Sequence, residues 1–270
     1  MGEEWLYEAS RSIRSARVNS SVPNVARVWN YLTDGRDNFE SDRRAARQLI
    51  AASPVMAQVG PASRAFLRRT VTYLAAEAGI RQFLDIGAGL PTEDNTHDLA
   101  QAVDPACRIV LVDNDPVVLS HARALLRSTP QGATSFIDAD ARDTRAVIDG
   151  ARETLDLTQP IGVIMIDILN FIEDADAVLR RVAAEVPSGS YLTVTQLSRD
   201  ERLAAPAHRW NQLAGATPVF LRDRQQVADW LCGLELIDPG IVEVPQWRPA
   251  PDDPQFPGGM PLLGAVARKP

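Results

Sequence analysis

An apolar stretch that ends in an acid and two glycines is the first feature of this sequence that could do chemistry. Residues 82–95 are QFLDIGAGLPTEDN, which places Asp85, Gly87 and Gly89 at the end of an expected strand. Without a Cβ, glycine lets backbone N–H groups approach a ligand closely. A dinucleotide motif, Gly-x-Gly-x-x-Gly, would need a third glycine where this chain has Thr92. The turn therefore indicates a bound nucleoside-type ligand, and a tight turn without a ligand is the alternative.

Two further acids follow the next two expected strands. Asp113 and Asn114 come after strand 108–112, and Asp113 could accept both hydroxyls of an adenosine ribose. Asp140 and Ala141 come after strand 134–137, where an acid can accept from an adenine amino group. Because dinucleotide sites favour the third glycine near the pyrophosphate, these acids favour a ligand with adenosine and no phosphate. An exposed acid at a strand end remains the alternative for Asp113.

Candidates for a catalytic group are few. Asp167 and Ile168 leave the fourth strand, 162–166, at the sheet edge where ligands of open parallel sheets bind. His97 and His208 are weaker candidates, with a surface or buried structural role as the alternative. Ser/His/Asp and metal-ligand spacings are missing from the sequence, so we expect no metal site.

Polar and aromatic residues before the first strand could cover the ligand. Tyr31 could face a cation through its ring, and Asn38 and Arg64 could pair with a carboxylate or an amine. The alternatives are a helix N-cap for Asn38 and a solvated helix position for Arg64.

The pattern of apolar residues predicts the elements that hold these side chains. A helix with Val25, Val28, Trp29 and Leu32 on one apolar face is expected between Pro23 and Gly35. Further helices are expected over 41–52 and 62–78, after an N-terminal arm over 1–20. Strands alternating with helices then indicate a mostly parallel α/β sheet. Strands over 234–244 and 262–268, joined by a Pro-rich loop, should close it. We divide the chain into an arm and helical cap, 1–80, and a ligand-binding domain, 81–270.

Composition excludes several classes of protein. The net charge of −7 argues against a nucleic-acid partner. The longest apolar run is about six residues, too short to cross a membrane. The N-terminus lacks a signal-peptide pattern, and the distant Cys107 and Cys232 suggest buried or partly buried free thiols. We therefore expect a cytoplasmic protein.

Long blocks of this sequence resemble a known family. They are ARVWNYLTDGRDNFESDR (26–43), RAFLRRTVTYLAAEAGIRQFLDIGAGLPTEDNTHDLAQ (64–101), RIVLVDNDPVVLSHARALL (108–126), WRP (247–249) and GAVARKP (264–270). The chain resembles the actinobacterial S-adenosyl methyltransferase family, formerly a domain of unknown function, within the class I S-adenosylmethionine-dependent methyltransferases.

The resemblance implies a Rossmann-like sheet under an N-terminal helical cap. It also implies S-adenosylmethionine or S-adenosylhomocysteine as cofactor, held by these residues: Gly87, Gly89, Asp113, Asn114, Asp140 and Ala141. Two segments depart from the family pattern. Residues 33–37 are Thr-Asp-Gly-Arg-Asp instead of Leu-Gly-Gly-Lys-Asp, and Asn170 stands where a histidine is more usual, which weakens a general base there.

We therefore predict a methyltransferase that acts on a small molecule. The catalytic residue is not evident, yet positioning alone can contribute roughly 7–11 kcal/mol to such a displacement. The alternatives are a regulator or sensor that binds S-adenosylmethionine or its product without turnover, and a nicotinamide-dependent oxidoreductase. The oligomeric state stays open, with a homodimer as one possibility.

Overall fold

The computed structural model describes residues 18–92, 94–125, 127–251, 253–256 and 258–270. Most of the predicted N-terminal arm lies outside these ranges. Within them, eight strands form one sheet in the order β3-β2-β1-β4-β5-β8-β6, and β7 also pairs with β8.

Five parallel strands make up most of this sheet. They are β1 (Gln82–Ile86), β2 (Arg108–Asp113), β3 (Ala133–Asp138), β4 (Gly162–Met165) and β5 (Tyr191–Leu197). β1, β4 and β5 are buried along their whole length because helices cover both faces of the sheet. β1 lies between β2 and β4, so the strand order reverses at the carboxyl end of β1. The mostly parallel sheet expected from the sequence is confirmed.

The C-terminal strands close the sheet in antiparallel fashion. β8 (Leu262–Arg268) pairs with β5 and with two short strands, β6 (Glu235–Leu236) and β7 (Val242–Glu243). The prediction of one strand over 234–244 is wrong. An Asp-Pro-Gly turn at 238–240 interrupts it, with the N–H of Gly240 donating to the carbonyl of Ile237 at 2.8 Å. A short helix, η2 (Val244–Gln246), follows.

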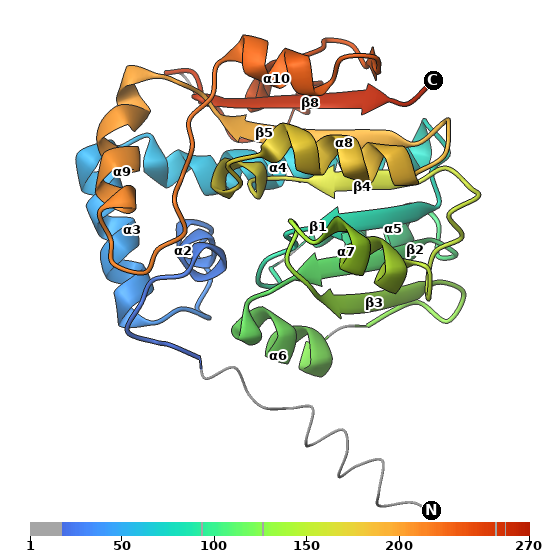
Figure 1. Ribbon diagram of the computed structural model, residues 1–270, viewed down its shortest axis with the longest axis horizontal. Coiled ribbons are helices and arrows are strands. Elements are labelled where there is room, and N and C mark those ends of the chain that lie inside the picture. Colours follow the sequence, from blue (N-terminus) through green and yellow to red (C-terminus); the bar gives the residue numbers. More distant parts are fainter. Residues whose placement is uncertain (1–17, 93, 126, 252, 257) are drawn as a thin grey trace, which may run out of the picture.

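Helices cover both faces of the sheet (Figure 1). α4 (Met56–Ala76) and α5 (Thr96–Val103) pack on one face. α7 (Thr144–Ala151), α8 (Ala175–Glu185) and α10 (Arg224–Trp230) pack on the other. α6 (Pro116–Leu125) lies beside the edge strand β3.

Three helices lie beyond the carboxyl ends of the parallel strands, at the left of Figure 1. These are α2 (Val25–Leu32), α3 (Glu40–Ala52) and α9 (Glu201–Asn211), and η1 (Leu169–Phe171) follows β4. α2 lies between Pro23 and Gly35 as expected, and α3 agrees with prediction to within one residue. α4 begins at Met56, six residues before the predicted position 62, and it accommodates Pro61 inside the helix.

A buried arginine joins this helical layer to the sheet. Arg27 of α2 forms ion pairs of 2.9 Å with Asp42 of α3 and with Asp115, which precedes α6. All three side chains are at most 4% exposed. Asp115 also accepts from the N–H of Val117 at 2.7 Å, so the pair fixes the helical layer against the loop that follows β2.

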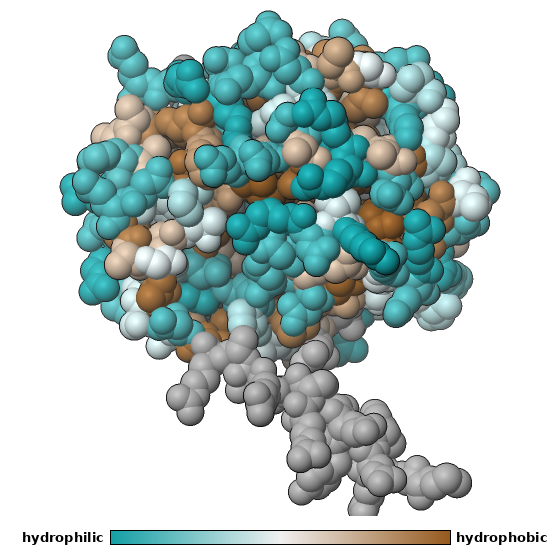
Figure 2. Space-filling model, in the orientation of Figure 1, coloured by the Kyte–Doolittle hydropathy of each residue, from teal (hydrophilic) through white to brown (hydrophobic). Residues whose placement is uncertain are grey.

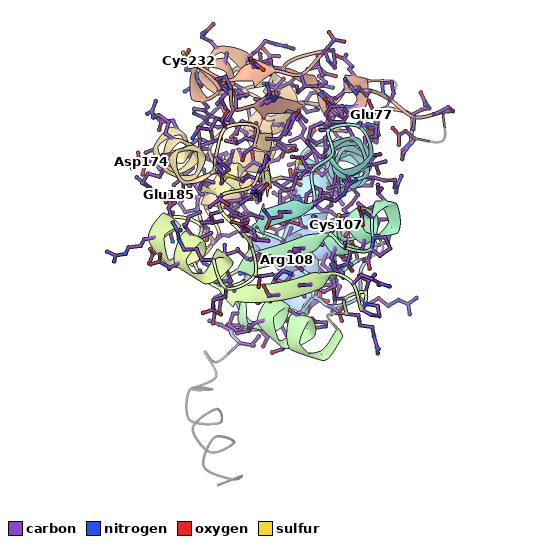
Figure 3. All side chains as sticks on the ribbon, turned by 90° about the vertical axis from the view of Figure 1, so that its right-hand side faces the viewer. Glu77, Cys107, Arg108, Asp174, Glu185 and Cys232 are labelled. Carbon is purple, nitrogen blue, oxygen red and sulfur yellow. The ribbon has the colours of Figure 1, made fainter. Side chains whose placement is uncertain are left out.

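The surface is mixed in character. Hydrophilic residues cover most of the face shown in Figure 2. Cys107 and Cys232 are both free and lie in distant parts of the molecule (Figure 3). Cys107 is buried as expected, but Cys232 is exposed, which corrects the prediction for that thiol. Within the described ranges, no helix is long and apolar enough to cross a membrane.

Candidate functional site

The glycine turn after β1 closes against the neighbouring strands. Gly87 and Gly89 have φ of +82° and +68°, in the left-handed region that favours glycine. The N–H of Gly87 donates to the carbonyl of Val112 at 2.8 Å, and the N–H of Gly89 donates to Asp113 Oδ2 at 2.9 Å. A Cβ on Gly87 would lie 2.6 Å from the Cβ of Ile168, whereas one on Gly89 would meet no atom within 4 Å. Gly89 thus leaves open space on the ligand side of the turn.

A single cavity extends over this turn and along the carboxyl ends of β1 to β4. It brings together most of the predicted cofactor residues: Arg64, Asp85, Gly87, Gly89, Asp113, Asn114, Asp140, Ala141, Asp167 and Ile168. The helices beyond the strand ends supply the rest of the wall, including Val25 and Trp29 of α2 and Ser63 of α4.

Asp113 is oriented by backbone N–H groups. Its Oδ2 accepts from Gly89, and its Oδ1 accepts from the N–H of Asp115 at 2.9 Å. Burial raises the pKa of Asp113, and these two hydrogen bonds oppose the shift. A carboxylate fixed in this way still has free lone pairs for ligand hydroxyls.

Asp140 is more exposed and is paired with its neighbour. Arg142 donates to both carboxylate oxygens, at 2.9 and 2.5 Å, and Asn114 Nδ2 lies 3.3 Å from Oδ2. The hydrogen bonds from Arg142 lower the pKa of Asp140. The guanidinium of Arg142 thus joins the cavity wall beside the acid predicted to meet adenine.

Asp85 of β1 and Arg64 of α4 line the cavity next to the glycine turn. Asp85 is 7% exposed and accepts a 2.5 Å hydrogen bond from Thr96 Oγ1. Burial raises its pKa to about 6, although Thr96 and the charge of Arg64 act in the opposite direction. Arg64 donates to the carbonyl of Asp94 at 2.6 Å, and burial lowers its pKa against the attraction of Asp85, Asp94 and Asp167.

Asp167 is the most constrained acid of the cavity. Its φ is +64°, a conformation that costs a non-glycine residue roughly 1–3 kcal/mol and that clusters at functional sites. Trp29 Nε1 donates to Oδ2 at 2.7 Å, and Thr195 Oγ1 donates to Oδ1 at 3.1 Å. Burial raises the pKa of Asp167, opposed by the neighbouring Ser63 hydroxyl, Trp29 and Thr195.

Asn170, which departs from the family pattern, has a structural role. It is fully buried, and its Nδ2 donates to the carbonyl of Asp167 at 3.0 Å. Its Oδ1 accepts from the N–H of Leu197 at 2.7 Å, which ties the segment after β4 to β5. Asn170 therefore holds Asp167 in position instead of facing the cavity.

Four candidates lie outside this cavity. Tyr31 lies next to Arg47 of α3, and Asn38 Nδ2 donates to Asn30 Oδ1 at 2.8 Å. His208 of α9 is exposed, and its Nε2 lies 2.9 Å from Nε2 of Gln212, the residue after the helix. His97 lines an adjoining cavity beyond the glycine turn, and its buried Nδ1 has no partner among the described residues. Burial lowers the pKa of His97.

Trp29, Ser63 and Arg142 line the cavity beside its acids, although none of them was predicted as a site residue. Trp29 was assigned to the apolar stripe of its helix, whereas its indole N–H reaches Asp167. Ser63 lies one residue before the predicted Arg64, and Arg142 lies two residues after Asp140. Proximity to a predicted residue was the available signal for the last two. Among the described residues, no group of three or more His, Cys, Asp or Glu is placed to hold a metal ion.

The sheet order, the reversed strand order at β1 and the acids at the strand ends define a class I methyltransferase-like α/β protein. The magnesium protoporphyrin IX methyltransferase of Synechocystis, solved with S-adenosylhomocysteine, shares this fold with a TM-score of 0.54. The two proteins are 14% identical over 90% of this chain and 93% of the other.

This chain belongs to the S-adenosyl methyltransferase family, whose sequence model matches residues 11–270. A DUF574 family protein from Streptomyces avermitilis is 37% identical, with a TM-score of 0.90 over 94% of this chain and all of the other. A candidate methyltransferase from Thermobifida fusca is 34% identical, with a TM-score of 0.85 over 95% and 98% of the chains. A search of curated proteins found no match. The resemblance seen in the sequence is confirmed.

Proposed function

We propose that this protein transfers a methyl group from S-adenosylmethionine to a small-molecule acceptor. One observation carries the proposal: the glycine turn and the acids of β1, β2, β3 and β4 line one continuous cavity. Membership of the S-adenosyl methyltransferase family supports it.

The residues present suit an adenosyl ligand. Asp140 and Ala141 would meet the adenine, and Asp113 would accept from the ribose hydroxyls, since its backbone donors already fix its orientation. Gly89 leaves room for the ligand above the turn. Arg64 and Asp85, next to the turn, would hold the carboxylate and amine of the methionine part.

When bound, S-adenosylmethionine supplies a methyl group that is already activated on a sulfonium. The chain then has to position an acceptor and exclude water, and α2 with Trp29 forms the wall that would do so. The buried Asp167 is the group best placed to receive an acceptor proton. A nicotinamide dinucleotide would also need space for a pyrophosphate, for which the third glycine is missing at Thr92.

The experiment has two stages. Ligand released from the purified protein is identified by mass spectrometry, and the protein is then incubated with methyl-labelled S-adenosylmethionine and fractions of a metabolite extract. We expect an adenosyl ligand and label in a small product. Binding without label transfer to any fraction would support the sensor alternative, and a bound dinucleotide would contradict the proposal.

A further inference from the structure

Three acids of the cavity, Asp85, Asp113 and Asp167, are buried and form no ion pair with another described residue. Asp85, Asp113 and Asp167 accept hydrogen bonds only from hydroxyl, indole and backbone donors, and none lies within 4.0 Å of a described Lys, Arg or His nitrogen. The charge of Arg64 acts on Asp85 and Asp167, and Arg142 is paired with Asp140. The cavity therefore presents an excess of negative potential to whatever it binds.

The strand order fixes where each acid meets the ligand. Asp113 ends β2, the glycine turn follows β1, and Asp167 follows β4 on the other side of β1. Ile168 packs directly on Gly87, so Asp167 adjoins the turn. In S-adenosylmethionine the sulfur joins the ribose to the methionine chain. A ligand with its ribose at Asp113 thus carries its sulfur over the turn, towards Asp167.

Asp167 is held in a fixed orientation at this point. Its backbone N–H donates to Thr195 Oγ1 at 2.7 Å, and Asn170 Nδ2 donates to its backbone carbonyl. Trp29 donates to its carboxylate and brings an aromatic ring beside it, and aromatic faces attract cations. Contacts from α2, η1 and β5 maintain the strained backbone of Asp167. Such support is expected where the orientation of one side chain matters for function.

We propose that Asp167 makes this cavity selective for the methylated, positively charged cofactor over the demethylated product. The inference rests on the proposed function, because it assigns a role within the same cofactor site. Loss of the methyl group leaves the bonding electron pair on sulfur, so that a sulfonium cation becomes a neutral thioether. The rest of the ligand is unchanged. A buried carboxylate facing the sulfur would bind the cation more tightly and favour release of the product.

Calorimetry tests this with three ligands. These are S-adenosylmethionine, S-adenosylhomocysteine and sinefungin, in which a carbon bearing a protonated amine replaces the methylated sulfur. We expect the wild type to bind both cationic ligands at least about tenfold more tightly than S-adenosylhomocysteine, equivalent to about 1.4 kcal/mol. In Asp167→Asn, which removes the charge and keeps the shape, the three affinities should fall within about threefold of one another.

Two matched variants separate charge from packing. Asp113→Asn should weaken all three ligands by the same factor, because the ribose is common to them. Trp29→Phe should keep the preference for cationic ligands, because the carboxylate remains. Equal weakening of all three ligands by Asp167→Asn would overturn the inference and leave the proposed function standing.

The wild type alone also provides a test that does not depend on how Asp167→Asn folds. Binding of S-adenosylhomocysteine as tight as that of both cationic ligands would overturn the inference. Failure of the wild type to bind any of the three would overturn the proposed function together with it.

Discussion

The carboxylates at the strand ends govern how this site responds to pH and to ligand. Asp85 is almost fully enclosed, and the O–H of Thr96 is its closest donor. Burial makes the ionised form of Asp85 unfavourable and raises its pKa to about 6, from the ordinary value of 3.8. Folding therefore favours the protonated form of this side chain.

A stability measurement can detect this shift. Because the folded pKa exceeds the unfolded value, the stabilising contribution is full below about pH 4 and is lost as pH rises towards about 6. The rise of the pKa from 3.8 to about 6 corresponds to roughly 3 kcal/mol of unfolding free energy. Urea unfolding of the ligand-free protein between pH 4 and 7.5 should show this loss for the wild type and not for Asp85→Asn. Parallel pH profiles for the two proteins would contradict the assignment.

Asp113 should matter for binding more than for folding. Its two oxygens are positioned by Gly89 and Asp115 to accept from ribose hydroxyls. We expect Asp113→Asn to weaken S-adenosylmethionine about a hundredfold, as the loss of charge-assisted hydrogen bonds implies. Calorimetry measures the effect, and Asp149→Asn, at an exposed position of α7, serves as the control. A dissociation constant within threefold of the wild type would place the ribose elsewhere.

Residue types and strand ends were enough to predict the acids that line the cavity. Asp85 and Asp113 lie near the end of apolar strands, Asp140 and Asp167 follow such strands, and parallel strands bring their carboxyl ends to one edge. Side chains on helices were harder to place. Trp29 shares the apolar stripe of α2, and only the fold reveals that its N–H meets Asp167, 138 residues away.

At the scale of elements, the turn between β1 and α5 depends on two glycines for different reasons. Gly87 is packed against Ile168, whereas Gly89 faces open space. Gly87→Ala should destabilise the fold by about 1–3 kcal/mol through overpacking, in addition to the cost of its φ. Gly89→Ala should keep more of the stability and lose S-adenosylmethionine binding, because its Cβ enters the cavity.

Unfolding and binding measured on both glycine variants separate the two roles. Retained binding in Gly89→Ala at wild-type affinity would contradict the placement of the ligand over the turn.

The attachment of α2 to the sheet depends on one buried cation. Arg27→Ala leaves Asp42 and Asp115 buried without their partner, which typically costs about 3–5 kcal/mol. Urea denaturation measures the loss, and Arg152→Ala, from an exposed ion pair, should leave stability nearly unchanged. A loss for Arg27→Ala as small as that of the control would show that other contacts hold the helical layer.

Helices and strands were predicted where the local apolar pattern and the turn residues indicate the same element. An element was missed where contacts between distant residues determine whether it forms. The five parallel strands follow from short apolar runs between turn residues. α9 was not predicted, since Pro206 lies inside it and proline usually ends a helix. Packing of Leu203, Pro206 and Trp210 into the core accounts for its formation.

On the scale of the whole molecule, the helical layer and the sheet edge enclose the site together. α2 and α4 contribute one wall, and the carboxyl ends of β1 to β4 contribute the other. The alternation of strands and helices predicts the fold class, and the family blocks predict the helical cap. The packing of the helical layer against the sheet depends on contacts such as that between Arg27 and Asp115. These residues are 88 positions apart, so the contact leaves no local pattern in the sequence.

Cofactor-dependent stability of the purified protein tests the central claim most directly. A ligand present at a hundred times its dissociation constant stabilises a folded protein by about 2.7 kcal/mol. We predict that saturating S-adenosylmethionine raises the melting temperature and that NAD does not. A rise with NAD, or none with either S-adenosylmethionine or S-adenosylhomocysteine, would contradict the assignment of this cavity.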